Sequence, residues 1–226
     1  MSKAKSICDR VYAVGGSGLS APEDAFIYLV DAGCELVLID SGVGYSVSRI
    51  EDNIRSLGFE PARVWHVIAT HCHIDHIGGL SAWKERYGSK IIAHELDRAG
   101  IEGENNSLTA ASMYGVDYKP VKVDTLLAGE AQELVLGDMK FHFLHTPGHT
   151  PGSIGVYIDT MDGRVLFGQD IHGPFSPDWG SDLQMWRASM RKLLGLRADV
   201  LCEGHAGVYR GDKVGKYIES YLKRYA

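Results

Sequence analysis

The sequence predicts an α/β fold in which two β-sheets pack face to face and helices cover their outer faces. Short apolar and β-branched segments form two series along the chain, as expected for two sheets. Amphipathic stripes of helical spacing are interspersed with these segments. The length of 226 residues suits one good-sized domain, so we expect a single domain over residues 1–226.

The first strand series lies in the N-terminal part of the chain. Segments with strand character cover residues 11–14, 25–30, 35–39, 64–69 and 90–93. Apolar residues recur at helical spacing from Val47 to Leu57, and Gly58 is well placed to end that helix. A second, short helix is expected over residues 80–87.

The second strand series continues toward the C-terminus. Its expected strands cover residues 134–136, 140–144, 153–158, 164–167 and 199–202. Apolar faces at helical spacing extend from Leu183 to Leu194 and from Val214 to Tyr225, so two helices are expected there. We expect both faces to pack onto the core.

Four potential metal ligands occur within six residues of the segment THCHIDHIGG: His71, His73, Asp75 and His76. The apolar run before them predicts a buried strand. The ligands then lie where the chain leaves the C-terminal end of that strand, a position at which α/β proteins open binding crevices. Imidazole and carboxylate together suit zinc, iron or manganese better than magnesium or calcium. A lone histidine is usually an ordinary residue, but this clustered spacing predicts a metal site.

The HxHxDH pattern resembles the signature of the metallo-β-lactamase superfamily, and further motifs of that family follow in order. His149 lies in a TPGHTPG segment, Asp170 follows the strand over residues 164–167, and His205 follows the strand over residues 199–202. Asp40 matches the early aspartate of the family. The resemblance implies a four-layer αββα sandwich of two mixed sheets flanked by helices.

The resemblance also implies two divalent metal ions per chain. The first metal would be held by His71, His73 and His149, and the second by Asp75, His76 and His205. Asp170 would bridge them. Zinc is the default expectation, and iron or manganese suit the same ligands. Asp40 would orient a ligand imidazole or the loop that carries it.

The activity implied by the resemblance is hydrolysis of a small thioester, ester or lactone by a metal-bridging hydroxide. Asp75 could relay a proton as well as bind metal, and His172 is close enough in sequence to Asp170 to help polarise a substrate. The chain is most similar to glyoxalase II-type hydrolases, whose helical C-terminal domain helps to bind glutathione. The residues after His205 leave room for one helix, so a glutathione thioester is not the expected substrate. N-acyl homoserine lactonases share the same ligand set, so a lactone substrate stays open.

Two other activities compete with hydrolysis. Persulfide dioxygenases resemble this chain and use a single iron on a subset of these ligands. A metal-dependent nuclease is disfavoured because the net charge is −6 and the pI is near 5.9, which leaves no general basic surface for nucleic acid.

Two segments are expected to wall the site. Residues 102–119 are polar and glycine-containing and could form a lid, and residues 172–180 are expected to form an irregular loop near the metals. Tyr114, Phe175 and Trp179 are candidate substrate contacts. The alternative is that these aromatic side chains only anchor their loops.

The expected partner is a small-molecule substrate, without nucleic acid or membrane. No apolar run approaches the ~20 residues of a membrane span. No apolar region follows the N-terminal lysines, so a secretory signal is not expected and a cytoplasmic location is. The four cysteines show no CxxC spacing and are expected to be free thiols. The oligomeric state stays open between monomer and homodimer.

Overall fold

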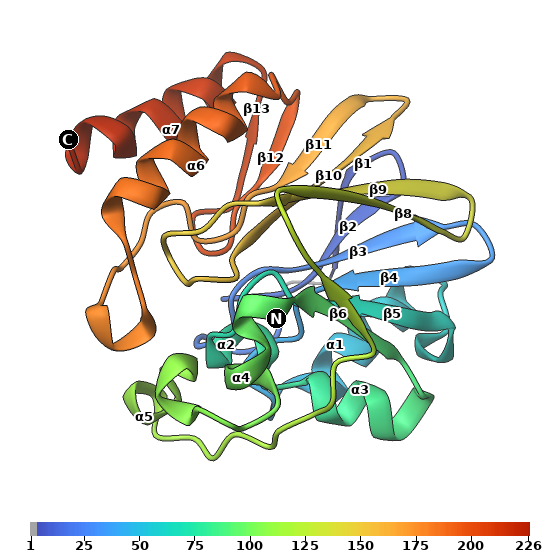
Figure 1. Cartoon of the computed structure of the whole chain (residues 1–226). Helices are drawn as coiled ribbons and strands as arrows, with labels where there is room; N and C mark the ends of the chain where they lie inside the picture. The colour runs from blue at the N-terminus through green and yellow to red at the C-terminus, as the bar shows by residue number, and fades with distance from the viewer. Residues whose placement is uncertain (1–3) are drawn as a thin grey trace.

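Two β-sheets pack face to face in the computed structural model, which describes residues 4–226 (Figure 1). Helices cover the outer face of each sheet, so the chain forms four layers in the order helix, sheet, sheet, helix. The αββα arrangement implied by the sequence resemblance is confirmed. No helix within residues 4–226 is long and apolar enough to cross a membrane.

The first sheet contains seven strands in chain order. They are β1 (Lys5–Cys8), β2 (Val11–Gly15), β3 (Ile27–Ala32), β4 (Glu35–Ile39), β5 (Val64–Ile68), β6 (Lys90–His94) and β7 (Thr125–Leu127). Neighbours from β1 to β4 are antiparallel, and neighbours from β4 to β7 are parallel. Because parallel strands end at the same edge of a sheet, the segments after β4 and β5 meet there. Asp40 and the HxHxDH motif lie in these two segments.

The second sheet contains six strands in the order β13-β12-β11-β10-β9-β8. They are β8 (Ala131–Leu136), β9 (Met139–His145), β10 (Ile154–Thr160), β11 (Gly163–Phe167), β12 (Val200–Cys202) and β13 (Val208–Arg210). Only the β11–β12 pair is parallel. His149 lies in the β9–β10 connection, and Asp170 and His205 follow the ends of β11 and β12.

Four helices form the outer layers: α1 (Val47–Ser56) and α3 (Leu80–Tyr87) on the first sheet, and α6 (Leu183–Gly195) and α7 (Asp212–Arg224) on the second. Short helical turns occupy the connections. They are η1 (Pro61–Arg63), α2 (Ile74–Ile77), η2 (Glu95–Asp97), α4 (Arg98–Ile101), η3 (Asn106–Thr109), α5 (Ala111–Tyr114) and η4 (Pro177–Trp179).

Three apolar clusters hold the layers together. The cluster between the sheets includes Tyr28, Phe141 and Phe167, and the outer clusters include Trp83 on α3 and Trp186 on α6. Each of these side chains is fully buried. Burying a large apolar side chain stabilises a fold by roughly 1.5–3 kcal/mol, so all three interfaces contribute to stability.

The structure departs from the expected elements in a few places. Strands β1, β7 and β13 were not predicted, and the strand expected over residues 25–30 begins later, as β3. Residues 172–180 are irregular apart from the single turn η4. The polar segment of residues 102–119 contains the turns η3 and α5.

Candidate metal centre

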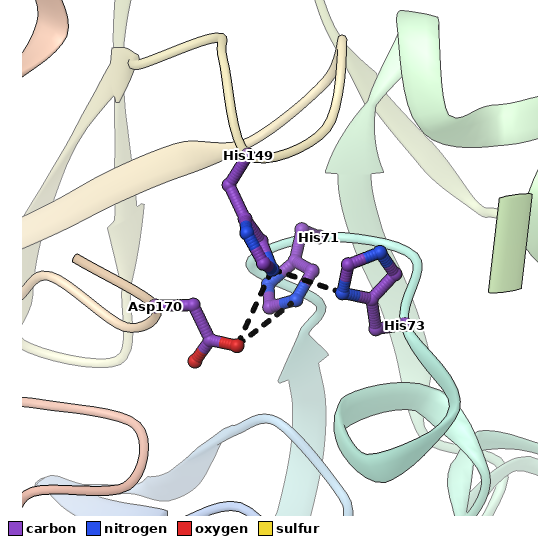
Figure 2. Close-up of side chains that lie close together, drawn as sticks. All are labelled: His71, His73, His149 and Asp170. Carbon is purple, nitrogen blue, oxygen red and sulfur yellow. Dashed lines mark hydrogen bonds and ion pairs between the residues drawn. The ribbon is translucent and has the colours of Figure 1, made fainter. Parts of the chain in front are cut away.

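All seven predicted ligands lie at one edge of the sandwich, in loops from both sheets. They form two groups, each with ligand atoms within 4.8 Å of one another. The first group is His71, His73, His149 and Asp170, and the second is Asp75, His76 and His205. Figure 2 shows the first group converging around a common point. These groups correspond to the two ligand sets expected from the sequence.

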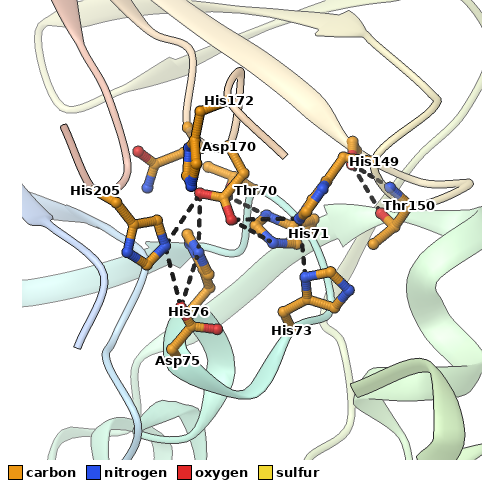
Figure 3. A network of polar contacts seen from close by, with 12 residues as sticks. Thr70, His71, His73, Asp75, His76, His149, Thr150, Asp170, His172 and His205 are labelled. Carbon is orange, nitrogen blue, oxygen red and sulfur yellow. Dashed lines mark hydrogen bonds and ion pairs between the residues drawn. The ribbon is translucent and has the colours of Figure 1, made fainter. Parts of the chain in front are cut away.

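Asp170 lies between the two groups and offers one carboxylate oxygen to each (Figure 3). Its Oδ2 is 3.3 Å from Nε2 of His149 and 3.8 Å from Nε2 of His71. Its Oδ1 is 3.3 Å from Nε2 of His76 and 3.4 Å from Nε2 of His205. A carboxylate that bridges two ions would have this arrangement.

Buried polar atoms without hydrogen-bond partners test whether these residues fit a metal. Nε2 of His71, Nε2 of His76 and Oδ1 of Asp170 are buried and have no such partner within the described chain. Leaving a buried polar atom unpaired costs about 1–3 kcal/mol, so such atoms usually serve another ligand. Nitrogen and carboxylate donors suit zinc, iron or manganese, so the donor set fits divalent metal binding.

The pKa values of histidines in the site shift in opposite directions. Burial lowers the pKa of His71 and of His73 well below the usual range, so both imidazoles stay neutral as metal binding requires. Burial also opposes the charged form of His205, but Asp170 and Asp75 outweigh it and raise its pKa to about 10. This surplus of negative charge around His205 suits a cation.

Asp40 connects three of the loops that form the site. Its Oδ1 accepts a hydrogen bond from the backbone N–H of Thr70 at 2.8 Å, and its Oδ2 accepts one from the Thr70 hydroxyl at 2.8 Å. Oδ2 also lies 2.7 Å from Nδ1 of His76 and accepts a hydrogen bond from the Gln169 side chain. With Nδ1 held in this way, Nε2 of His76 faces the carboxylates of Asp75 and Asp170. Through this contact Asp40 would orient a ligand imidazole.

Asp97, which sequence reasoning missed, connects two ligand loops. Its Oδ2 accepts hydrogen bonds from the backbone N–H of Cys72 at 2.9 Å and from the Thr150 hydroxyl at 2.6 Å. Its Oδ1 accepts the backbone N–H of Gly152 at 2.6 Å. Asp97 belongs to no motif. The available signal was its position soon after a buried parallel strand, like that of the ligands themselves.

Cys72 lies between two predicted ligands but does not share their orientation. Its side chain is fully buried, and its thiol donates to the carbonyl oxygen of Leu108 at 3.4 Å. The thiol is therefore engaged outside the two groups of ligands.

A cavity of about 210 Å³ opens beside the two groups of ligands. Tyr114, His172 and Trp179 line it together with Asp75, Asp170 and His205. Burial and the nearby Asp75 raise the pKa of Tyr114, so its hydroxyl keeps its proton. The ring centroid of Trp179 is 4.8 Å from that of His73.

His172 is held at the wall of this cavity by Glu203. Its Nδ1 lies 2.9 Å from Oε1 of Glu203, whose side chain is fully buried. Oε2 of Glu203 accepts the backbone N–H groups of His205 and Ala206, each at 2.7 Å. The same carboxylate therefore positions His172 and the loop that carries His205.

Phe175 lies away from the cavity. Its ring centroid is 5.3 Å from that of Trp186 and 5.1 Å from that of Tyr225, within the apolar cluster under α6 and α7. The alternative role of anchoring the loop fits Phe175 better than substrate contact does.

Comparisons with known proteins agree with this geometry. The profile of the metallo-beta-lactamase superfamily matches residues 21–205. A probable metallo-hydrolase of Bacillus subtilis is 29% identical over 149 residues, which cover 64% of this chain and 66% of the relative. A hydroxyacylglutathione hydrolase of Anaeromyxobacter dehalogenans is 30% identical over 149 residues, 66% of this chain and 47% of the relative. An N-acyl homoserine lactonase of a Bacillus species is 30% identical over 119 residues, 52% of this chain and 42% of the relative.

Solved structures share the whole arrangement. A subclass B3 metallo-beta-lactamase of Bradyrhizobium japonicum superposes with a TM-score of 0.83 at 25% sequence identity, over 99% of this chain and 92% of that structure. The similarity therefore covers both sheets and all the loops that carry the predicted ligands.

Proposed function

The chain belongs to the metallo-beta-lactamase superfamily, and on this premise we propose that it is a hydrolase with two divalent metal ions that cleaves a small thioester, ester or lactone. One observation carries the dinuclear proposal. The two oxygens of Asp170 face different histidines, Oδ2 toward His149 and Oδ1 toward His205. A mononuclear site would leave the second group of ligands without a function.

Two bound divalent ions would generate a hydroxide nucleophile at neutral pH and polarise the carbonyl of the substrate. Carboxylates of the chain would keep the second ion and the histidine at the cavity wall in place. Asp170 and Asp75 supply negative charge around His205, and Glu203 holds His172 at the cavity wall. With Nδ1 facing Glu203, the other ring nitrogen of His172 is left to contact a bound substrate.

The cavity supports hydrolysis without a covalent intermediate on a serine or cysteine. Among the described residues that line it, none is a serine, threonine or cysteine. Its walls include apolar side chains, among them Met113, Pro174 and Trp179, beside the carboxylates of Asp75 and Asp170. An apolar wall beside a polar, metal-binding floor suits a small acyl compound.

The named activities of two relatives support the substrate class. One is a hydroxyacylglutathione hydrolase, which acts on a thioester, and the other is an N-acyl homoserine lactonase, which acts on a lactone. Both compounds contain an acyl carbonyl carbon of the kind that a metal-activated water attacks. A single-iron dioxygenase on a subset of these ligands remains the competing proposal.

Metal content per chain tests the proposal, measured by elemental analysis on protein purified without added metal. The wild type is expected to hold two ions, His205→Ala close to one, and the matched variant His142→Ala, which changes a histidine outside both groups of ligands, two. His142 lies on β9, where its ring stacks on that of Tyr157 with 4.3 Å between the ring centroids. A single iron, retained in His205→Ala and lost in His149→Ala, would exclude the dinuclear hydrolase and direct attention to oxygen uptake.

A further inference from the structure

A second cavity, of about 530 Å³, adjoins the cavity at the metal centre. The two share Met113 and Trp179 as walls. The other walls of the second cavity, which we call the outer groove, are Ser107, Ser112, Ser176 and Asp178. The groove lies between the loops of η3 and η4, which pack against each other. A substrate whose reacting bond lies at the metals would extend past Met113 and Trp179 into this groove.

The charge of the outer groove is negative. Asp178 is the one charged residue among its described lining residues, and no lysine or arginine lines either cavity within residues 4–226. The Asp178 side chain is exposed, and its backbone N–H donates to the Ser176 hydroxyl at 3.2 Å. An anionic group in the groove would therefore meet a carboxylate and no compensating cation.

The uncharged walls of the groove favour polar and cationic groups. Serine hydroxyls donate and accept hydrogen bonds without a charge preference of their own. Trp179 lines both cavities, and the face of an indole ring attracts cations. The negative charge of Asp178 also attracts cations.

We propose that the outer groove selects substrates by charge: the end remote from the reacting bond is cationic or uncharged, and a carboxylate there is disfavoured. This inference rests on the proposed hydrolase function, because that function places the reacting bond at the metals. A glutathione thioester carries two carboxylates and one ammonium group on its thiol part, a net negative charge, so it is expected to be a poor substrate. A neutral acyl lactone or an ester with an ammonium group fits the groove.

Three probe esters with the same acyl group separate charge from shape. They are the butyrate esters of choline, of 3,3-dimethylbutanol and of 4-hydroxybutanoate, whose remote ends are cationic, neutral and anionic. The corresponding butyramides, which carry the same ends on a bond that is not cleaved, report binding by calorimetry. Binding and hydrolysis are measured with the wild type and with Asp178→Lys. The control is Glu60→Lys, an equal charge change at an exposed residue before β5, at the opposite end of that strand from the metal ligands.

The wild type and Glu60→Lys are expected to bind the cationic amide roughly three- to tenfold more tightly than the anionic amide, as for a single charge pair near a surface. Asp178→Lys is expected to reverse that order. High salt is expected to remove both preferences, because exposed charges are screened.

The outcomes for the groove and for the hydrolase are distinguishable. Equal binding of the three amides by the wild type, or an unchanged order in Asp178→Lys, would overturn charge selection even if the esters are hydrolysed. Charge-ordered binding that reverses in Asp178→Lys would support the groove even if no ester is cleaved, and the hydrolase proposal would then fail alone.

Discussion

Buried aspartates that are not predicted ligands hold the loops of the metal centre in place. Asp40 joins the end of β4 to Thr70 and His76, and Asp97 joins the backbone around Cys72 to the turn that carries His149. Both side chains are almost completely buried. Their hydrogen bonds join loops that follow different strands. Each aspartate therefore fixes the distance between loops that lie far apart in the sequence.

The role of Asp97 is tested by Asp97→Asn. The amide keeps the shape but has one oxygen fewer, so at least one of the N–H groups of Cys72 and Gly152 faces an amide NH₂ group. An unpaired buried group of this kind costs about 1–3 kcal/mol, and we expect that loss in the free energy of unfolding, together with weaker metal retention. Denaturant unfolding and metal analysis measure the two effects.

The matched control is Asp117→Asn, at an exposed position with the same change of charge. It should leave both quantities unchanged. If Asp97→Asn also retained full stability and metal, the contacts between the two loops would not depend on this carboxylate.

At the scale of elements, the turn between β9 and β10 depends on Gly148. This residue has φ of +132°, and a Cβ there would lie 2.3 Å from the backbone nitrogen of Trp186 on α6. Its carbonyl accepts the backbone N–H of Asp182, the residue that caps α6, at 2.9 Å. The turn and the helix thus fit together only without a side chain at residue 148.

Gly148→Ala is therefore expected to destabilise the fold by about 2–4 kcal/mol and to displace His149. Gly155→Ala is the control, because the one close contact of its added Cβ would be the flexible end of Leu193 at 2.9 Å, and we expect a loss of about 1 kcal/mol or less. Thermal unfolding and metal content compare the two variants. Equal losses would show that the turn tolerates a side chain at residue 148.

Sequence patterns predicted the elements that have a clear apolar run or an apolar face at helical spacing. Strand β4, which is buried along its whole length, and helix α3, which buries Leu80 and Trp83, have the expected bounds. Strands β1, β7 and β13 span only three or four residues each, too few for a pattern, and they form because a neighbouring strand offers hydrogen bonds.

The candidate site divides in the same way. The seven candidate ligands could be picked out of the sequence because each lies in a local motif. Asp97 and Glu203 could not, because their partners, such as Thr150 and His172, are distant in the chain and meet them only in the folded protein.

For the whole molecule, the metal centre lies across the boundary between the two sheets. His71, His73, Asp75 and His76 follow β5 of the first sheet, whereas His149, Asp170 and His205 follow strands of the second. Direct hydrogen bonds between the two sides also occur at this edge, such as that from Ile154 N–H to the carbonyl of Thr70 at 2.9 Å. Bound ions would therefore add a cross-link to an interface that the central apolar cluster already forms.

Metal removal by a chelator should thus loosen one edge of the sandwich and leave the fold intact. An ion present at 100 to 1,000 times its dissociation constant stabilises the native state by about 2.7–4.1 kcal/mol. For a domain of this size each kcal/mol shifts Tm by about 2–4 °C, so we expect Tm to fall by roughly 5–15 °C for each ion removed. Hydrogen exchange should accelerate in residues 70–78, 146–153 and 168–175, where six of the seven candidate ligands lie.

Strands β2 and β3 provide the internal reference for that experiment, since they pack into the central cluster without carrying a ligand. Their exchange should be the same with and without chelator, and adding zinc back should restore both Tm and the protection of the three loops. If chelation instead unfolded β2 and β3 together with the loops, the apolar cluster would not suffice to hold the two sheets. If it changed neither Tm nor exchange, no ion would be joining them.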